Sequence, residues 1–286
     1  MKIRTLGLLA NPANPVGKAL VPSVVTACKR AGVALMAEPA VAYGGHVHTI
    51  AEIIGEADAL LVLGGDGTIL RAVGHMGERI LPILGVNIGT LGFLTECEPE
   101  ALDESIARLA AGAYEVELRM LLSARLDGDD AVFTALNDVV ISRGSFTRVV
   151  QTDAFVDGAL AARYSGDGTI IASPTGSTAY SLSAGGPIIA PGLDCIILAP
   201  ICPHTLSSRP MIVSAASQAR LLLRPRGEDG GMLLAVDGAQ RRILHDDAQI
   251  HIRRSERRLP FVRFGEGRFF ELLRNKLTKW GGEPQA

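Results

Sequence analysis

Aromatic side chains and net charge are both scarce in this sequence. Phe, Trp and Tyr make up 5% of the 286 residues, and 28 basic against 30 acidic residues leave a formal net charge of −2. A balanced charge gives no overall positive field that would attract nucleic acid or an anionic membrane. Few aromatic rings likewise disfavour a surface that stacks bases. We therefore expect no nucleic acid and no membrane as partners, and any bound phosphate must be held locally.

Cysteines and long apolar runs are few as well. The cysteines are widely spaced or lie within apolar runs, which is not the spacing of a disulfide framework. The longest apolar runs, at 60–63 and 195–201, are too short to span a bilayer. The first residues also lack the apolar stretch of a signal peptide. This composition favours a reducing, cytoplasmic location. The four cysteines are Cys28, Cys97, Cys195 and Cys202.

Two common phosphate-binding motifs are missing. A P-loop ending at Gly17-Lys18 would need Gly at position 12 and Ser or Thr at position 19, where the chain has Pro12 and Ala19. No G-x-G-x-x-G follows any expected strand. A nucleoside triphosphatase of the P-loop kind and an ordinary Rossmann dehydrogenase are therefore both disfavoured.

The hydrophobic pattern changes near residue 115. Up to Gly112, short apolar runs alternate with longer amphipathic stretches, as in βα units around a parallel sheet. From Tyr114 the apolar period becomes two, which indicates β-strands. After Phe261 the period is helical again. These periods predict an α/β nucleotide-binding domain with a parallel sheet over 1–115, a β-rich domain over 116–260, and a C-terminal helix within 261–286 that returns to the first domain.

The expected elements follow from these periods. In the first part we expect strands at 6–10, 33–37, 59–63 and 83–86, and helices at 16–31, 49–55 and 99–111. A further helix follows the strand at 59–63 and its glycine turn and continues over 71–76. In the second part we expect strands at 116–120, 132–136, 139–142, 152–156, 170–172, 219–223, 232–236 and 249–252, followed by the last helix at 267–280.

A glycine-rich turn follows the strand expected at 59–63. It reads Gly64-Gly65-Asp66-Gly67-Thr68 and precedes a helix. Glycines let the backbone approach a phosphate closely, and free N–H groups at a helix start offer donors and a positive dipole. Asp66 would repel a bare phosphate, so it indicates either a bound Mg²⁺ or a base aimed at an acceptor alcohol. The alternative is that Asp66 only caps the helix.

A second polar stretch lies in the β-rich part. Asp167 stands in a repeat of the Gly-Asp-Gly-Thr tetrapeptide, and the segment 173–187 after it is rich in hydroxyl groups and glycine. A short helix over 178–184 would offer another place for a polar ligand, and an ordinary capped helix with a hairpin turn is the alternative. Asn137 and Asp138 lie inside an apolar run and need partners if they are buried.

The order of these motifs resembles that of the NAD kinase family. The resemblance runs from about Leu6 to the C-terminal helix, and its most discriminating stretch is 174–180. It implies transfer of a phosphoryl group from ATP, or from polyphosphate, to the 2′-hydroxyl of the adenosine ribose of NAD, giving NADP, with Mg²⁺ as the divalent metal ion. The motifs that carry it are Gly64–Thr68, Leu136–Val140, Asp167-Gly168, Pro174–Tyr180, Pro200–His204 and Arg209-Pro210.

The resemblance also implies roles for individual residues. Asp66 would meet the ribose hydroxyls and accept the proton, and Asn137 and Asp138 would hold the NAD. The family often has Glu at the position of Asp138, so the side chain here is one methylene shorter. Asp167 would reach the NAD of a neighbouring subunit in a homodimer or homotetramer. The other implied binding residues are Gly64, Gly65, Gly67, Thr68, Arg148, Thr175, Thr178, Ala179, Tyr180, Ser183, Asp237 and Gln240.

Two alternative functions are compatible with the same motifs. A lipid kinase of the diacylglycerol-kinase type shares the Gly-Gly-Asp-Gly-Thr turn, but it needs an apolar acceptor pocket or a membrane-facing surface that the sequence does not show. A catalytically silent NAD(H)-binding sensor would not need Asp66, so the presence of that residue beside intact glycines disfavours a silent protein.

Overall fold

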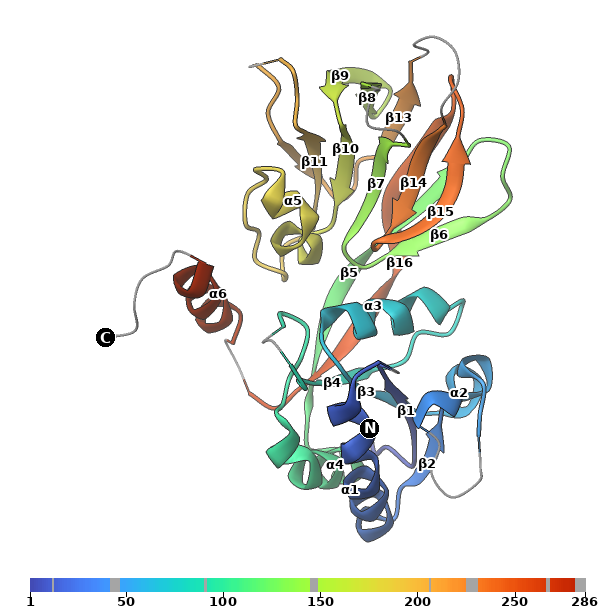
Figure 1. Cartoon of the computed structure of the whole chain (residues 1–286), viewed down its shortest axis with the longest axis vertical. Helices are drawn as coiled ribbons and strands as arrows, with labels where there is room; N and C mark the ends of the chain where they lie inside the picture. The colour runs from blue at the N-terminus through green and yellow to red at the C-terminus, as the bar shows by residue number, and fades with distance from the viewer. Residues whose placement is uncertain are drawn as a thin grey trace. The chain divides into compact units, whose positions relative to one another are not determined.

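A parallel sheet is the centre of the first structural unit, which comprises Met1–Leu118 and Leu259–Ala286. In this computed structural model the strands follow the order β2-β1-β3-β4-β16 (Figure 1). The structure describes residues 1–11, 13–41, 47–89, 92–144, 149–205, 207–224, 231–265 and 268–280. The strands are β1 (Thr5–Ala10), β2 (Ala34–Ala37), β3 (Ala59–Leu63), β4 (Ile83–Val86) and the end of β16 (Gln249–Arg263).

Helices cover both faces of this sheet, because its strands are apolar on both sides. All of β3 is buried. Helices α1 and α4 pack on each other, and so do α2 and α3. Helix α1 begins after the Asn14 side chain accepts a bond from the Val16 N–H, and it ends at Gly32 in the left-handed conformation. The helices are α1 (Pro15–Ala31), α2 (Ile50–Glu56), α3 (Asp66–His75), α4 (Leu102–Ala111) and α6 (Arg268–Trp280), with 3₁₀ turns η1 (Pro39–Val41) and η2 (Pro99–Ala101).

The second structural unit, Arg119–Arg258, is built from antiparallel strands. One sheet has the order β12-β11-β10-β7-β14-β15, and the strands β16, β13, β8 and β9 pair in a second one. Alternate residues of both sheets, such as Ile171 and Leu221, share one buried core. The strands are β5 (Glu115–Leu126), β6 (Val132–Ala135), β7 (Asp138–Arg143), β8 (Val150–Val156), β9 (Ala159–Gly166), β10 (Gly168–Ala172), β11 (Cys195–Ile201), β12 (Met211–Ser214), β13 (Ala219–Leu223), β14 (Met232–Val236) and β15 (Ala239–Leu244), with η3 (Thr175–Thr178) and α5 (Tyr180–Ser183) between β10 and β11.

The predicted fold class is confirmed, and the differences lie in single elements. The helix expected after the glycine turn and continuing over 71–76 is α3, which begins at Asp66 and ends at His75. The stretch expected as one helix from 99 is a 3₁₀ turn followed by α4. Strand β16 continues to Arg263, well beyond the expected end at 252. The strands β9, β11, β12 and β15 were not among the predicted ones. Among the described residues, none of the helices is both long and apolar enough to cross a membrane.

Candidate active site

Asp66 stands at the first position of α3, directly after the turn that leaves β3. The N-cap of this helix is Gly65, and no side chain caps the helix. The Asp66 carboxylate instead accepts two backbone hydrogen bonds from residues that follow β4: the Phe93 N–H lies 3.0 Å from Oδ2, and the Leu94 N–H lies 3.0 Å from Oδ1. The alternative that Asp66 only caps its helix is therefore wrong, and the carboxylate is held in one orientation.

The glycines around Asp66 fall into two groups. A Cβ on Gly64 would overlap the Thr68 hydroxyl, and a Cβ on Gly92 would overlap Asp66 Oδ1, so packing within the protein requires both glycines. A Cβ on Gly65 or Gly67 would meet nothing within 4 Å. Packing therefore does not explain the last two, whereas close approach of a ligand to the backbone does.

In the second unit, Asp237 organises the turn that leads into β7. Its Oδ2 accepts from the Leu136 N–H at 2.8 Å, and its Oδ1 accepts from the N–H groups of Asn137 and Asp138 at 2.8 and 3.1 Å. The Asp237 N–H in turn donates to the Asp138 carbonyl at 3.0 Å. Burial raises the Asp237 pKa, and these N–H bonds oppose the rise. Asp237 thus fixes the backbone that presents Asn137 and Asp138.

Asp138 is a buried carboxylate, with 5% of its surface exposed. Within the described part of the chain, nothing donates a hydrogen bond to its side chain, although its backbone is paired within the sheet. Burial, and secondarily the Asp237 carboxylate, raises the Asp138 pKa to about 7. Because a buried acid without a donor is costly, a ligand that donates hydrogen bonds would satisfy it.

The hydroxyl-rich segment packs directly on this turn. The Ser173 N–H donates to the Asn137 carbonyl at 2.8 Å, and a Cβ on Gly176 would overlap that same carbonyl. The helix expected at 178–184 is instead the 3₁₀ turn η3 followed by the single turn α5. Within it, the Thr178 hydroxyl donates to the Thr175 carbonyl at 3.3 Å.

Tyr180 is the exposed aromatic side chain of this segment, with 46% of its surface accessible. Partial burial raises its pKa, and so do Cys202 and the carboxylates of Asp167 and Asp138. The structure therefore brings Tyr180 near both predicted acids. Asp167 itself forms an ion pair with Arg143 at 3.0 Å.

The remaining predicted binding residues are Ser183, Ala179, Gln240 and Arg148. Ser183 ends α5 and is exposed, and Ala179 lies between η3 and α5 and is half-buried. Gln240 lies on β15, where its backbone pairs with Ala235. Arg148 lies outside the described residues.

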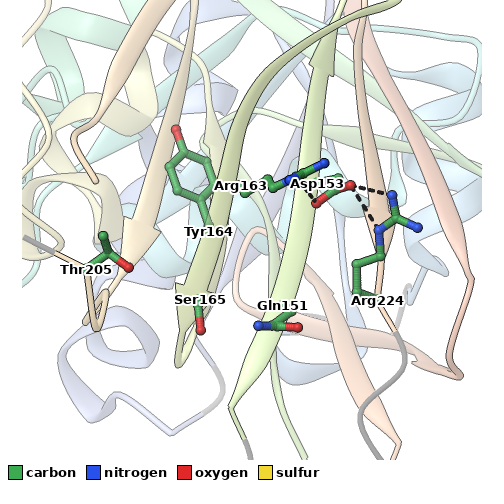
Figure 2. Close-up of a pocket in the computed structure, with 7 residues that line it drawn as sticks. All are labelled: Gln151, Asp153, Arg163, Tyr164, Ser165, Thr205 and Arg224. Atoms are coloured by element: carbon green, nitrogen blue, oxygen red, sulfur yellow. Dashed lines mark hydrogen bonds and ion pairs between the residues drawn. The ribbon is translucent and has the colours of Figure 1, made fainter. Parts of the chain in front are cut away.

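A pocket in the second unit contains none of the predicted residues. It has a volume of about 360 Å³ and lies at β8, β9 and β13 (Figure 2). Its buried acid, Asp153, is already paired with Arg224 at 2.5 Å and with Arg163 at 3.6 Å. Because the Asp153 carboxylate is neutralised by these arginines, it is a poor candidate for a reactive group. The lining residues are Gln151, Asp153, Arg163, Tyr164, Ser165, Thr205 and Arg224.

The sequence analysis missed the residues that hold Asp66. Gly92, Phe93 and Leu94 act through backbone atoms, which leave no side-chain signature. One signal was available: Asn87-Ile88-Gly89 and Gly92-Phe93-Leu94 follow the carboxyl end of a parallel strand, where ligands bind in open α/β sheets.

Comparison with known proteins covers both units. Residues 15–114 match the family model of the ATP-NAD kinase N-terminal domain, and residues 136–264 match that of the ATP-NAD kinase C-terminal domain. An NAD kinase of Solibacter usitatus is 38% identical over 285 residues, 98% of each chain. An NAD kinase of Geobacter metallireducens is 44% identical over 236 residues, 82% of each chain.

Solved structures are similar as well. The crystal structure of yeast NADH kinase complexed with NADH has a TM-score of 0.90 at 25% identity, covering 99% of this chain and 89% of that chain. An NAD kinase from Archaeoglobus fulgidus in complex with ATP has a TM-score of 0.77 at 27% identity, covering 96% of this chain and 98% of that chain.

An α/β unit with an oriented carboxylate in a glycine turn, together with an antiparallel unit that has its own polar turn, is the arrangement expected of a nucleotide-binding phosphotransferase. Since family models match both parts and relatives are 38% and 44% identical, the chain belongs to the NAD kinase family. The resemblance predicted from its motifs is thereby confirmed, and the chain is a phosphotransferase that acts on NAD. These matches give no support to a lipid kinase or to a silent sensor.

Proposed function

We propose that this chain transfers the γ-phosphoryl group of ATP to the 2′-hydroxyl of the adenosine ribose of NAD, forming NADP and ADP. The observation that carries the proposal is the Asp66 carboxylate, which two backbone N–H groups hold beside glycines that face open space. Phosphoryl transfer depends mainly on alignment and charge stabilisation, because its transition state is loose. An acid held in one orientation suits this demand.

Asp66 acts on the acceptor. The ribose oxygen forms the bond to the γ-phosphorus while the bond to the ADP oxygen breaks, and the hydroxyl proton passes to the Asp66 carboxylate. Each carboxylate oxygen that accepts one N–H keeps further acceptor capacity for this hydroxyl. A carboxylate is a weak base for a sugar hydroxyl, so the proton moves late, as the hydroxyl becomes acidic.

The polar turn of the second unit binds NAD. Asn137 and Asp138 supply an amide and a buried acceptor, and Asp237 keeps their backbone in place. Tyr180 adds a half-exposed aromatic face on which an adenine ring can stack. Thr178, Ala179 and Ser183 complete this set of contacts.

ATP enters with Mg²⁺. Among the described residues there is no group of three or more His, Cys, Asp and Glu that could hold a metal. Kinases generally hold Mg²⁺ largely through substrate phosphates, so the phosphates of ATP would bring the metal to the site. When bound, the metal neutralises charge on the transferred phosphoryl group.

The chain acts as a homodimer or homotetramer in this proposal. Asp167 supports it because its side chain, 28% exposed, projects from a strand-rich unit that has edges to cover. Asp167 then contributes to the NAD site of a neighbouring subunit.

The function is tested by incubating the purified chain with NAD, ATP and Mg²⁺ and measuring NADP with an NADP-specific dehydrogenase. Asp66→Asn should lower kcat by about 100-fold or more, because it removes the proton acceptor and keeps the size. Asp58→Asn is the matched control, since Asp58 also accepts two backbone N–H bonds but from Arg4 and Thr5, at the opposite ends of the strands. A second arm replaces ATP with polyphosphate.

Two results would count against the proposal. If the wild-type chain forms no NADP with either donor, the function is wrong. If Asp66→Asn turns over at a normal rate with saturating substrates, the function stands but the role of Asp66 does not.

A further inference from the structure

The last helix brings a cation to the residues that hold Asp66. Helix α6 packs through Phe269, whose ring centroid lies 6.2 Å from that of Phe93. Two helical turns later, the Lys276 ammonium lies 4.1 Å from the centroid of the same Phe93 ring. The backbone N–H of Phe93 is one of the two donors to Asp66. One aromatic residue therefore links α6, its lysine and the reactive carboxylate.

The positive charge of the Lys276 ammonium is only partly balanced by neighbouring groups. Lys276 is half-buried, and burial lowers its pKa, while Asp66 is the charged group that opposes this shift. Within the described ranges, no oxygen accepts a hydrogen bond or an ion pair from Lys276, and the Phe93 ring face is its one close contact with a charge-stabilising group. An ammonium has three N–H donors, and no oxygen of the described residues accepts from those of Lys276.

A bound anion would supply those acceptors. The neighbouring glycines Gly65 and Gly67 leave open space beside Asp66, whose negative charge repels phosphate groups. A cation that interacts with Asp66 offsets that repulsion, and lysine commonly serves as a point charge for phosphate. NAD has a diphosphate too, but the group that it brings to Asp66 is an uncharged 2′-hydroxyl.

We propose that Lys276 binds the phosphate chain of the ATP donor, so that α6 contributes a donor-binding residue to the reaction. This inference rests on the proposed function. It gives the C-terminal helix a role that its expected packing alone does not require: the helix holds a positive charge on the ring of Phe93, whose backbone N–H donates to Asp66.

The test compares three variants by steady-state kinetics. Lys276→Met keeps a long side chain that can contact the Phe93 ring but removes the charge, Lys276→Arg restores the charge, and Arg274→Met removes an exposed charge from the same helix. We expect the KM for ATP to rise about tenfold or more in Lys276→Met, with the KM for NAD nearly unchanged. Lys276→Arg should recover most of the loss, and Arg274→Met should match the wild type.

A binding measurement separates donor binding from an effect on chemistry. Calorimetry with a non-hydrolysable ATP analogue and Mg²⁺ should show a Kd weaker by a similar factor in Lys276→Met. An unchanged Kd, an unchanged KM for ATP, or equal losses for ATP and NAD would overturn the proposal. Because the wild type is assayed for NADP in the same experiment, failure of the proposed function is seen separately.

Discussion

Replacing Asp138 by Asn should make the protein more stable at alkaline pH and should weaken its binding of NAD. The carboxylate is buried, receives no hydrogen bond from the described residues, and has a pKa raised to about 7 by burial and by Asp237. Asn has nearly the same shape but no charge. The substitution therefore removes the cost of ionising this site and leaves the packing in place.

The sign and size of this stability change follow from the linkage between folding and protonation of Asp138. The folded-state pKa of about 7 lies above the model value of 3.8, so between these values the folded chain holds a proton that the unfolded chain has released. Stability then falls as pH rises through this window, and the full loss is present above pH 7. At about 1.4 kcal/mol per pKa unit, the loss amounts to no more than about 4 kcal/mol. Well below pH 3.8 both states are protonated, so Asn and Asp should differ little there.

Urea unfolding at pH 5 and pH 8 measures this difference. The free energy of unfolding of Asp138→Asn should exceed that of the wild type at pH 8, and the gain should shrink at pH 5. Asp153→Asn is the contrasting control, because Asp153 is equally buried but paired with Arg224 and Arg163, and its loss should destabilise the chain. A gain for Asp138→Asn that is independent of pH, or a loss at pH 8, would refute the reasoning. In the same variant the KM for NAD should rise.

Three further predictions concern the reaction. Gly92→Ala should lower kcat nearly as far as Asp66→Asn, because its Cβ would displace the carboxylate, whereas Gly89→Ala meets nothing within 4 Å and should keep activity in the same NADP assay. Tyr180→Ala should raise the KM for NAD more than it lowers kcat, since a stacked ring binds ground and transition states alike; a collapse of kcat alone would contradict this. Mixing Asp66→Asn with Asp167→Ala subunits should restore activity above either parent, because a shared site leaves one intact site in each mixed dimer; no recovery despite proven exchange would exclude sharing.

The elements that the sequence predicted well are those whose own pattern decides their structure. The strand expected at 59–63 is present at Ala59–Leu63, because five consecutive apolar residues before a glycine turn leave little alternative. Strand β15 was missed because half of its sequence, AQRRIL, is polar, and its pairing with β14 makes it a strand.

The same distinction applies to the candidate site. Motif order predicted Asp66, Asp138 and Tyr180 as site residues, because each lies in a local stretch of unusual composition. It could not locate the donors to Asp66, since Phe93 and Leu94 contribute only backbone atoms from a distant part of the chain. Contacts of this kind are properties of the fold.

Three acids of the candidate site differ mainly in how many backbone N–H groups donate hydrogen bonds to them. Asp237 accepts three N–H bonds, which uses its carboxylate to shape the turn into β7. Asp66 accepts two, so it is oriented but retains acceptor capacity for a hydroxyl. Asp138 is buried, and the described residues donate none to its side chain, so its ionised form is costly until a ligand donates to it. In the proposed function, the number of donors thus separates a positioning acid, a reacting acid and a substrate-binding acid, and it explains why only Asp138→Asn is expected to stabilise the chain.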